Sequence, residues 1–392
     1  MLVRLWPLAL ATFAVGTDGF VIAGLLPGIA ADLGVSVAAA GQLVTVFALC
    51  FALSAPVTGA LTSGFDRRTA LVLALSVFTA GNVITAISAD YPVVLAARAV
   101  TALGAGMINS AASSTAAALA PAERRGRALA LVMGGLSVAS VLGLPLGTLI
   151  GASDWRVTLW AVAGLGATAA LGVRLRLPSV TLPATTLADR LAPMGNRTVL
   201  GIVATSMVTM AAFYTLFTYA TVALTGATGG STSRLILLLL VSGTGTVAGT
   251  LLAGRLTDRY RPRAVLVGAL MVVCAGLLVA PLAVRSMPSA LPWALVWGLS
   301  AGIPVVPQQH RLLTTAPSAA TVVLGLNSSA IYVGIGLGGA LGGLVQHWLP
   351  ADLLGLPAAV VAAVALALGL AVRDRAPDPR GATPETVRPG RL

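Results

Sequence analysis

Long runs of apolar residues, separated by short polar segments, dominate the sequence. Each run is long enough to cross a hydrocarbon core about 30 Å thick, at about 1.5 Å of helix per residue. The pattern predicts an all-α membrane protein with twelve transmembrane helices. We place the runs at 5–26, 43–63, 69–88, 92–118, 127–151, 157–174, 197–223, 235–254, 263–284, 289–308, 318–345 and 352–372.

The first run has a second interpretation, because Arg4 precedes it and a signal peptide also begins with a basic residue. The run is longer than the apolar core of a signal peptide, and it contains an acid. Both features favour a transmembrane helix.

Composition supports an integral membrane protein. The chain is 57% hydrophobic and 9% charged, whereas about a quarter of the residues in soluble domains are charged. Its net charge is +12, but the basic residues form short clusters between apolar runs, so we expect no binding of nucleic acid. Neither Cys50 nor Cys274, both inside apolar runs, belongs to a metal-binding pattern or a disulfide framework.

The basic residues predict the orientation in the membrane. All 24 are arginines, and a chain rich in Ala, Gly and Val without Lys suggests a bacterial source. With a cytoplasmic N-terminus, the outer loops hold only Arg156, Arg234 and Arg285, and nearly all the others fall on the cytoplasmic side. Positive residues favour that side. We therefore expect a multi-pass protein of the bacterial inner membrane, with both termini in the cytoplasm.

The sequence also repeats itself at an offset of 195 residues, almost half the chain. Gly59, Leu61, Thr62, Phe65 and Arg68 recur in register as Gly254, Leu256, Thr257, Tyr260 and Arg263. The repeat predicts two homologous six-helix bundles. We expect an N-terminal bundle at 1–174, a cytoplasmic linker at 175–196, a C-terminal bundle at 197–372 and a disordered tail at 373–392.

Two charged residues lie inside apolar runs, where an ionisable group is costly and usually functional. Asp18 lies about 12 Å below the outer end of the first helix, and Arg98 lies about 9 Å below the same face in the fourth. The two side chains can therefore meet at one depth. We expect the pair to take up and release a proton. Alternatively, it is a static ion pair that holds the two helices together.

Candidate pocket residues come from three helices. On the fourth helix, Arg98 and Asn109 share one face and Thr101 lies close to it, although an interhelical hydrogen bond is an equal alternative for Asn109. Asn327 lies about 15 Å into the eleventh helix, near the membrane midplane. Along the seventh helix, an i, i+3, i+4, i+7 stripe fits an adaptable apolar pocket or ordinary helix packing. Its members are Met210, Phe213, Tyr214 and Phe217.

Glycines recur every fourth residue in two helices, a spacing that lets helices approach closely. The first row, with a proline beside it, lies in the fifth helix, and the second lies in the eleventh. We expect both rows to allow helices to slide or rock. They consist of Gly143, Pro145, Gly147 and Gly151, and of Gly334, Gly338 and Gly342.

The loop Gly254 to Arg263 resembles the G-x-L-a-D-R-x-x-x-R signature of the major facilitator superfamily, which follows the second helix and recurs after the eighth. Three further stretches, at 16–36, 154–156 and 326–344, are similar to the twelve-helix drug:proton antiporter branch. The resemblance implies two rocking bundles and a cytoplasmic gate in the repeated loops. Alternatively, these charges only set the orientation of the chain in the membrane and have no role in gating. The candidate gate residues are Gly59, Asp66, Arg67, Arg68, Gly254, Asp258 and Arg259.

The chain departs from the family at two places. Ser63 and Gly64 replace the Asp and Arg of the signature in the first loop, so the gate there is expected to be weaker or to use Asp66 to Arg68. The fifth helix keeps the proline and glycines of the antiporter motif in a different order.

Together these features predict a proton-coupled secondary transporter that exports small amphipathic compounds. An exporter of sugars, nucleosides or amino acids is the nearest alternative, because such proteins share this scaffold. A membrane sensor that binds without transporting is a third hypothesis. No phosphate-binding motif for ATP occurs, and His310 and His347 belong to no catalytic or metal set. We expect no enzyme activity and no cofactor, with the proton gradient as the energy source. We also expect the protein to be a monomer in the bilayer.

Overall fold

The computed structural model describes residues 5–61, 64–181 and 192–373. These residues form helices without a strand, and twelve of the helical spans are long and apolar enough to cross a membrane. The predicted fold class is therefore confirmed. Parts of the predicted linker and tail, residues 182–191 and 374–392, lie outside the described residues.

Six spans belong to the part of the chain before the linker, here called the N-half. They are α1 (Trp6–Asp32), α2 (Val37–Leu61), α3 (Arg67–Ile87), α4 (Tyr91–Leu119), a fifth span made of α5 (Arg125–Val138), η3 (Ala139–Gly143) and α6 (Leu144–Ile150), and α7 (Trp155–Arg176).

The six spans after the linker form the C-half. They are α9 (Arg197–Phe217), followed by the single turns α10 (Ala220–Ala223) and α11 (Thr225–Thr228), then α12 (Thr232–Arg259), α13 (Pro262–Ala283), a tenth span made of α14 (Met287–Gly302) and α15 (Val305–Thr315), α16 (Ala320–Val345) and α17 (Gly355–Ala371). Short 3₁₀ turns occur at Ala122–Arg124, Ala192–Gly195, Pro317–Ala319 and Ala351–Leu353.

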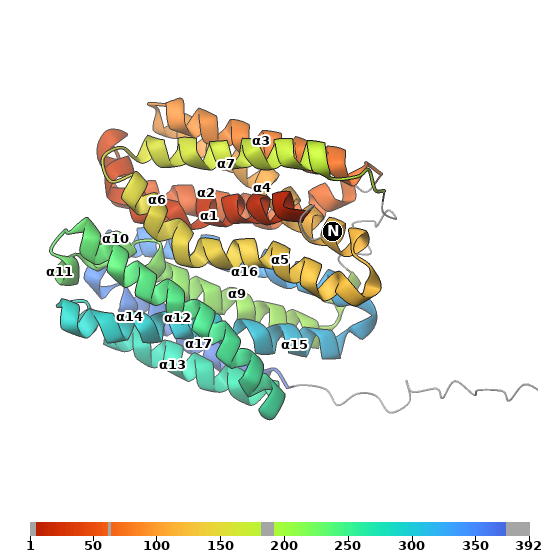
Figure 1. Ribbon diagram of the computed structural model, residues 1–392. Coiled ribbons are helices and arrows are strands. Elements are labelled where there is room, and N and C mark those ends of the chain that lie inside the picture. Colours follow the sequence, from red (N-terminus) through yellow and green to blue (C-terminus); the bar gives the residue numbers. More distant parts are fainter. Residues whose placement is uncertain (1–4, 62–63, 182–191, 374–392) are drawn as a thin grey trace, which may run out of the picture.

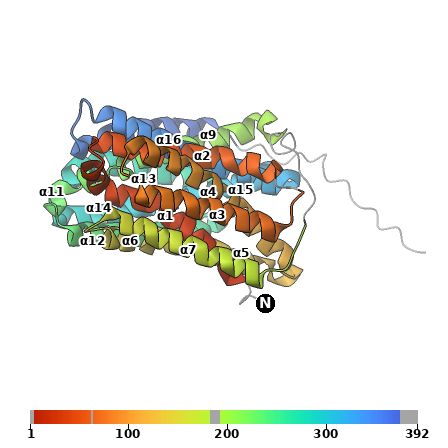
Figure 2. The same cartoon turned by 90° about the horizontal axis from the view of Figure 1, so that it is seen from above.

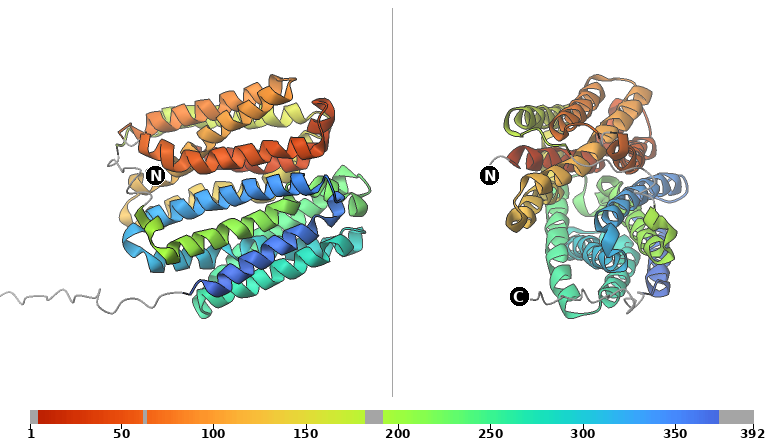
Figure 3. Two further views of the ribbon diagram at one scale, coloured as in Figure 1. Left: turned by 180° about the vertical axis from the view of Figure 1, so that it is seen from behind. Right: turned by 90° about the vertical axis from the view of Figure 1, so that its right-hand side faces the viewer.

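The helices run roughly parallel, with the N-half on one side and the C-half on the other (Figure 1). Helices α2 and α16 lie side by side across the seam between the halves (Figures 2 and 3). Most of the arginine-bearing ends, such as those of α5, α7 and α12, share one end of the bundle. We call that end the arginine-rich face and the other end the arginine-poor face.

Helix α1 continues to Asp32, although the predicted run ends at Leu26 before a proline. Pro27 cannot donate to the carbonyl of Ala23, four residues earlier. That carbonyl instead accepts a hydrogen bond from the Thr221 hydroxyl of the C-half at 2.7 Å. The helix therefore tolerates its proline because another element supplies the missing donor.

The fifth span contains a π-helical segment, η3, which ends two residues before Pro145. Because proline lacks an N–H, the regular pattern of backbone hydrogen bonds cannot pass through it, and a wider turn accommodates the defect. Such π segments are frequent at functional sites. This one lies against α1 and α12, where the two halves meet.

The tenth span breaks after Gly302, next to Pro304 and Pro307, and then extends to Thr315. The predicted run ends at residue 308, so the helix is longer than expected. The extension carries Arg311, whose side chain is only 1% exposed. The apolar pattern did not indicate this burial, which arises because α15 turns the residue into the C-half.

Both glycine rows lie in helix interfaces. A Cβ added at Gly143, Gly147 or Gly151 would lie 2.1–2.6 Å from side chains of Thr17, Val21 and Leu25 in α1. In α16, a Cβ at Gly334, Gly338 or Gly342 would lie 2.1–2.5 Å from backbone carbonyl oxygens of α9. A third set of glycines allows α12 and α14 to approach equally closely, because a Cβ at any of them would meet a backbone carbonyl oxygen of the facing helix. These glycines are at 245, 249, 298 and 302. The sequence analysis missed this set.

Replacing Gly338 by Val should separate α16 from α9, because its Cβ would lie 2.5 Å from the Ala211 carbonyl oxygen. Overpacking of this kind costs about 1–3 kcal/mol or more. We expect a lower melting temperature of the detergent-purified protein. Gly276→Val is the matched control, since no atom lies within 4 Å of a Cβ at Gly276. Equal melting temperatures for the two variants would contradict the prediction.

Candidate functional site

Asp18 of α1 and Arg98 of α4 form an ion pair in the interior of the N-half. Nη1 of Arg98 donates to Oδ1 of Asp18 at 2.7 Å, and the side chains are 1% and 0% exposed. A second nitrogen, Nη2, lies 3.4 Å from the backbone oxygen of Asp18. The Arg98 guanidinium also lies over the ring of Phe47 in α2, 4.4 Å from its centroid. The structure therefore brings together the two charged residues identified in the sequence.

The pair does not use all its hydrogen-bonding capacity. Oδ2 of Asp18 and Nε of Arg98 are buried without a hydrogen-bond partner in the described part of the chain, and so is the hydroxyl of Thr17. Fully buried polar atoms are normally paired, so unpaired ones suggest a functional role. The free carboxyl oxygen is the position where a proton can bind without breaking the contact to Arg98.

Aromatic rings connect this pair to the C-half. Phe47 lies 6.2 Å from Phe51, one turn along α2. Phe51 in turn stacks on Tyr332 of α16, with 3.7 Å between the ring centroids. The ring contacts thus form a continuous series from the Arg98 guanidinium across the seam, and sequence spacing alone gave no sign of the step to Tyr332.

On the fourth helix, Thr101 and Asn109 face different surroundings. Thr101 packs against Gly81 of α3, and its hydroxyl donates to the Ala97 carbonyl of its own helix at 2.8 Å. Asn109 is half-buried and makes no side-chain hydrogen bond within the described ranges. Thr101 therefore lies in a helix interface in this conformation, apart from the ion pair's free oxygen.

The aromatic stripe of α9 is part of a larger cluster. Phe213 and Phe217 lie 5.0 and 5.7 Å from Trp297 of α14, and Trp297 stacks on Trp293 at 4.9 Å. Tyr214 packs edge-on against both phenylalanines, while Met210 is half-buried beside them. The two tryptophans, four residues apart in the tenth span, were missed, although their spacing marks one helix face.

Asn327 and Met210 line a small cavity inside the C-half. Asn327 is 1% exposed, and its Oδ1 has no partner among the described residues. The cavity measures about 10 Å³, close to the smallest volume that holds one water molecule. Gln308, also on its wall, donates to the Ile202 carbonyl at 2.9 Å and accepts from Arg311 at 3.0 Å. A buried polar network therefore surrounds Asn327.

The first repeated loop is tied to the linker. Asp66 caps α3 through the Thr69 N–H at 3.1 Å and accepts from Ser179 and the Val180 N–H at 2.8 and 2.9 Å. Partial burial alone raises the pKa of Asp66, but the hydrogen bonds from Ser179, Thr69 and Val180 lower it to about 2. Beside it, Arg67 is buried and Arg68 half-buried, while Gly59 lies within α2.

The second repeated loop is more open. Asp258 and Arg259 are exposed at the end of α12, and the Arg259 guanidinium lies 5.8 Å from the Tyr260 ring. A Cβ at Gly254 would meet open space. Among the described residues, neither charge forms a salt bridge with the N-half.

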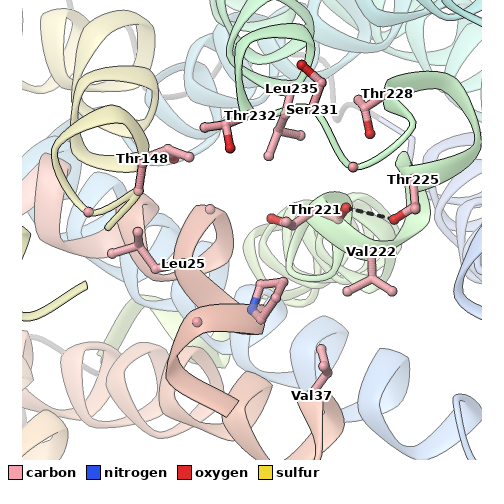
Figure 4. Close-up of a pocket in the computed structure, with 16 residues that line it drawn as sticks. Leu25, Val37, Thr148, Thr221, Val222, Thr225, Thr228, Ser231, Thr232 and Leu235 are labelled. Carbon is pink, nitrogen blue, oxygen red and sulfur yellow. Dashed lines mark hydrogen bonds between the residues drawn. The ribbon is translucent and has the colours of Figure 1, made fainter. Parts of the chain in front are cut away.

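At the arginine-poor face, the halves enclose a pocket of about 470 Å³ (Figure 4). Its walls come from α1, α2, α6, α10, α11 and the start of α12, and none of the described residues that line it is charged. Near it, Tyr219 donates to the Gly339 carbonyl at 2.9 Å, and its ring lies against Gly41 of the N-half. The sequence analysis did not identify this pocket.

Twelve apolar spans, with an ion pair buried among those of the N-half, define a multi-pass membrane protein with a charged site in its interior. Residues 8–339 match the family model described as Major Facilitator Superfamily. The chain is 35% identical over 390 residues to the "Chloramphenicol resistance protein" of Streptomyces lividans, covering 95% of this chain and 98% of the relative. It is 32% identical to the "Inner membrane transport protein YdhP" of Escherichia coli (strain K12), covering 92% and 93%.

Solved structures show the same fold. A bacterial homologue of the human lysosomal transporter Spinster, in its inward-facing and occupied conformation, matches with a TM-score of 0.77 at 19% identity, over 94% of this chain and 96% of that one. The chain belongs to the Major Facilitator Superfamily, a family of membrane transporters and not of enzymes.

Removing one charge of the buried pair should destabilise the protein, because an uncompensated buried charge costs about 3–5 kcal/mol. Asp18→Asn should cost more than Arg98→Gln, since an isolated carboxyl can become neutral by taking up a proton whereas a guanidinium stays charged. The double variant should lose less than the two single losses combined. Melting temperatures of the unmodified protein, the two single variants and the double variant in detergent test this coupling. If the stability losses of the two single variants simply add up in the double variant, the pair is not coupled.

Asp66→Ala should lower stability by about 1 kcal/mol, the typical value of a helix cap. Because the folded pKa lies below the ordinary value of 3.8, this contribution is complete above that value and disappears as the pH falls through 2. The difference in melting temperature from the unmodified protein should shrink over this range. Asp90→Ala is the control, as Asp90 precedes α4 without a capping hydrogen bond. A difference independent of pH would exclude the carboxylate as the cause.

Proposed function

We propose that the protein is a proton-coupled exporter of small amphipathic compounds, a drug:proton antiporter that works by alternating access. The observation that carries this proposal is the ion pair of Asp18 and Arg98, fully buried yet with one carboxyl oxygen unpartnered. A structural ion pair gains from satisfying every polar atom. A proton site needs a free oxygen instead.

Protonation of Asp18 is the coupling step. It removes the negative charge that holds Arg98, so the attraction between α1 and α4 drops from that of an ion pair to that of a hydrogen bond between the guanidinium and a neutral carboxyl. Arg98 then keeps the Phe47 ring, the Asp18 backbone carbonyl and a weaker contact with the neutral carboxyl as its partners. Loss of the proton restores the pair, and the two charge states thus favour different helix positions.

A movement of the Arg98 side chain is transmitted to the C-half through the contacting aromatic rings of α2 and α16. Phe47 follows the guanidinium, and the stacked pair of Phe51 and Tyr332 transmits the change to α16. The close glycine contacts between α16 and α9 make those two helices move together. When the arginine-rich face is closed, Asp258 and Arg259 pair with the first repeated loop and hold that face shut.

The substrate class rests on the relative in Streptomyces lividans, whose name links it to chloramphenicol resistance. An uncharged aromatic compound of this kind suits the Phe213, Tyr214, Phe217 and Trp297 cluster, which offers apolar ring faces. Exchange of one proton for a neutral molecule moves one charge across the membrane. Each 100 mV then supplies about 2.3 kcal/mol, enough for a concentration ratio of about fifty.

The protein lies in a bacterial inner membrane with both termini in the cytoplasm, so the arginine-rich face is cytoplasmic. It works as a monomer without a cofactor, and the proton gradient is its energy source. The halves at 1–174 and 197–372 rock about the site between them.

Transport in proteoliposomes tests the coupling. With an acidic interior, the unmodified protein should accumulate radiolabelled chloramphenicol, because protons leave as the compound enters. Asp18→Asn should reduce this accumulation at least tenfold while leaving equilibrium binding measurable, since it removes the proton site and not the aromatic cluster. Asp352→Asn, which alters an exposed acid, is the control.

Each other outcome identifies a different hypothesis. Normal accumulation by Asp18→Asn would refute the coupling role and leave the pair as a static contact. Binding without any flux in the unmodified protein would indicate a sensor. Flux of a sugar, nucleoside or amino acid without flux of chloramphenicol would favour the alternative exporter.

A further inference from the structure

The pocket at the arginine-poor face lies on the seam between the halves. Leu25 and Thr148 of the N-half line it together with Thr221 and Thr232 of the C-half (Figure 4). Its volume of about 470 Å³ falls within the range of pockets that bind drug-sized molecules. Because both halves contribute walls, the pocket must change shape whenever they rock.

Its lining is uncharged and rich in hydroxyl groups. Several hydroxyls are already engaged within the protein, among them Thr148 with the Leu144 carbonyl and Thr221 with the Ala23 carbonyl. Those of Thr228 and Thr232 have no hydrogen-bond partner among the described residues, and both side chains border the open space (Figure 4). The pocket therefore offers hydrogen bonds and apolar surface without a charge.

A hydrogen-bonded seal separates the pocket from the ion pair. Thr221 reaches the Ala23 carbonyl that Pro27 leaves free, 198 residues away in the chain. Asp18 lies five residues before Ala23, about 7.5 Å deeper along α1. Tyr219, packed on Gly41 and bonded to Gly339, adds a second contact near this level. A compound released from the interior must pass these contacts before it reaches the pocket.

We propose that this pocket is a second binding site for the exported compound, on the arginine-poor side of the Thr221–Ala23 seal, and that it accepts uncharged molecules with hydrogen-bonding groups. The inference rests on the proposed export function. Binding here after the seal opens keeps the compound from returning to the interior site while the halves rock back.

Protection of a cysteine tests occupancy directly. Thr232→Cys is introduced after Cys50 and Cys274 have been replaced by Ser, and the detergent-purified protein is labelled with a small uncharged thiol reagent. Chloramphenicol, the probe of the transport assay, should slow labelling at least threefold. Ser286→Cys, exposed on the same face outside the pocket, should be labelled at an unchanged rate.

A second variant fills the pocket. A Cβ at Gly28 meets no atom within 4 Å, so Gly28→Leu should occupy the space, abolish protection at Thr232→Cys and lower efflux at least fivefold. Gly268→Leu, where the surroundings are also open, should change neither. Unchanged labelling at a concentration that saturates binding would overturn the inference. Because the labelling needs no gradient, protection without uphill transport would support the pocket and refute only the export function.

Discussion

A buried ion pair is the interaction on which the rest of this molecule depends. Placing Asp18 and Arg98 in the membrane interior is costly, and their contact at 2.7 Å offsets that cost only while both are charged. The surrounding α1, α2 and α4 hold the two side chains in place, with the Phe47 ring covering the guanidinium. Any change in the charge of Asp18 therefore changes the balance of forces among three helices at once.

The same helix links the ion pair to the far end of the seam. In α1, Pro27 frees the Ala23 carbonyl, and Thr221 of the C-half supplies its donor. A defect within one half is thus satisfied only when the other half is in contact. This arrangement makes closure of the arginine-poor face favourable, although no salt bridge joins the halves in the described part of the chain. A neutral hydrogen bond is also easier to break than a buried charged one.

Close backbone approach is the second constraint. Where glycines of α16 meet carbonyl oxygens of α9, and those of the fifth span meet α1, there is no room for a Cβ. Without a hydrophobic driving force between helices in lipid, such dense packing supplies the attraction. It also makes the paired helices rigid units. Motion is then expected at the seam and at the helix breaks around Pro145 and Pro304, where backbone hydrogen bonds are already interrupted.

The sequence by itself determined the twelve spans and the residues of the ion pair, because apolar length and an isolated charge depend only on the nearby chain. It also placed the glycine rows. Only the tertiary structure decided that Trp297 completes the aromatic cluster, that Arg311 is buried, and that Thr221 meets Ala23. The ends of the first and tenth helices were misplaced for the same reason. Such contacts join residues far apart in the chain, and they depend on how whole helices cross, which local patterns do not encode.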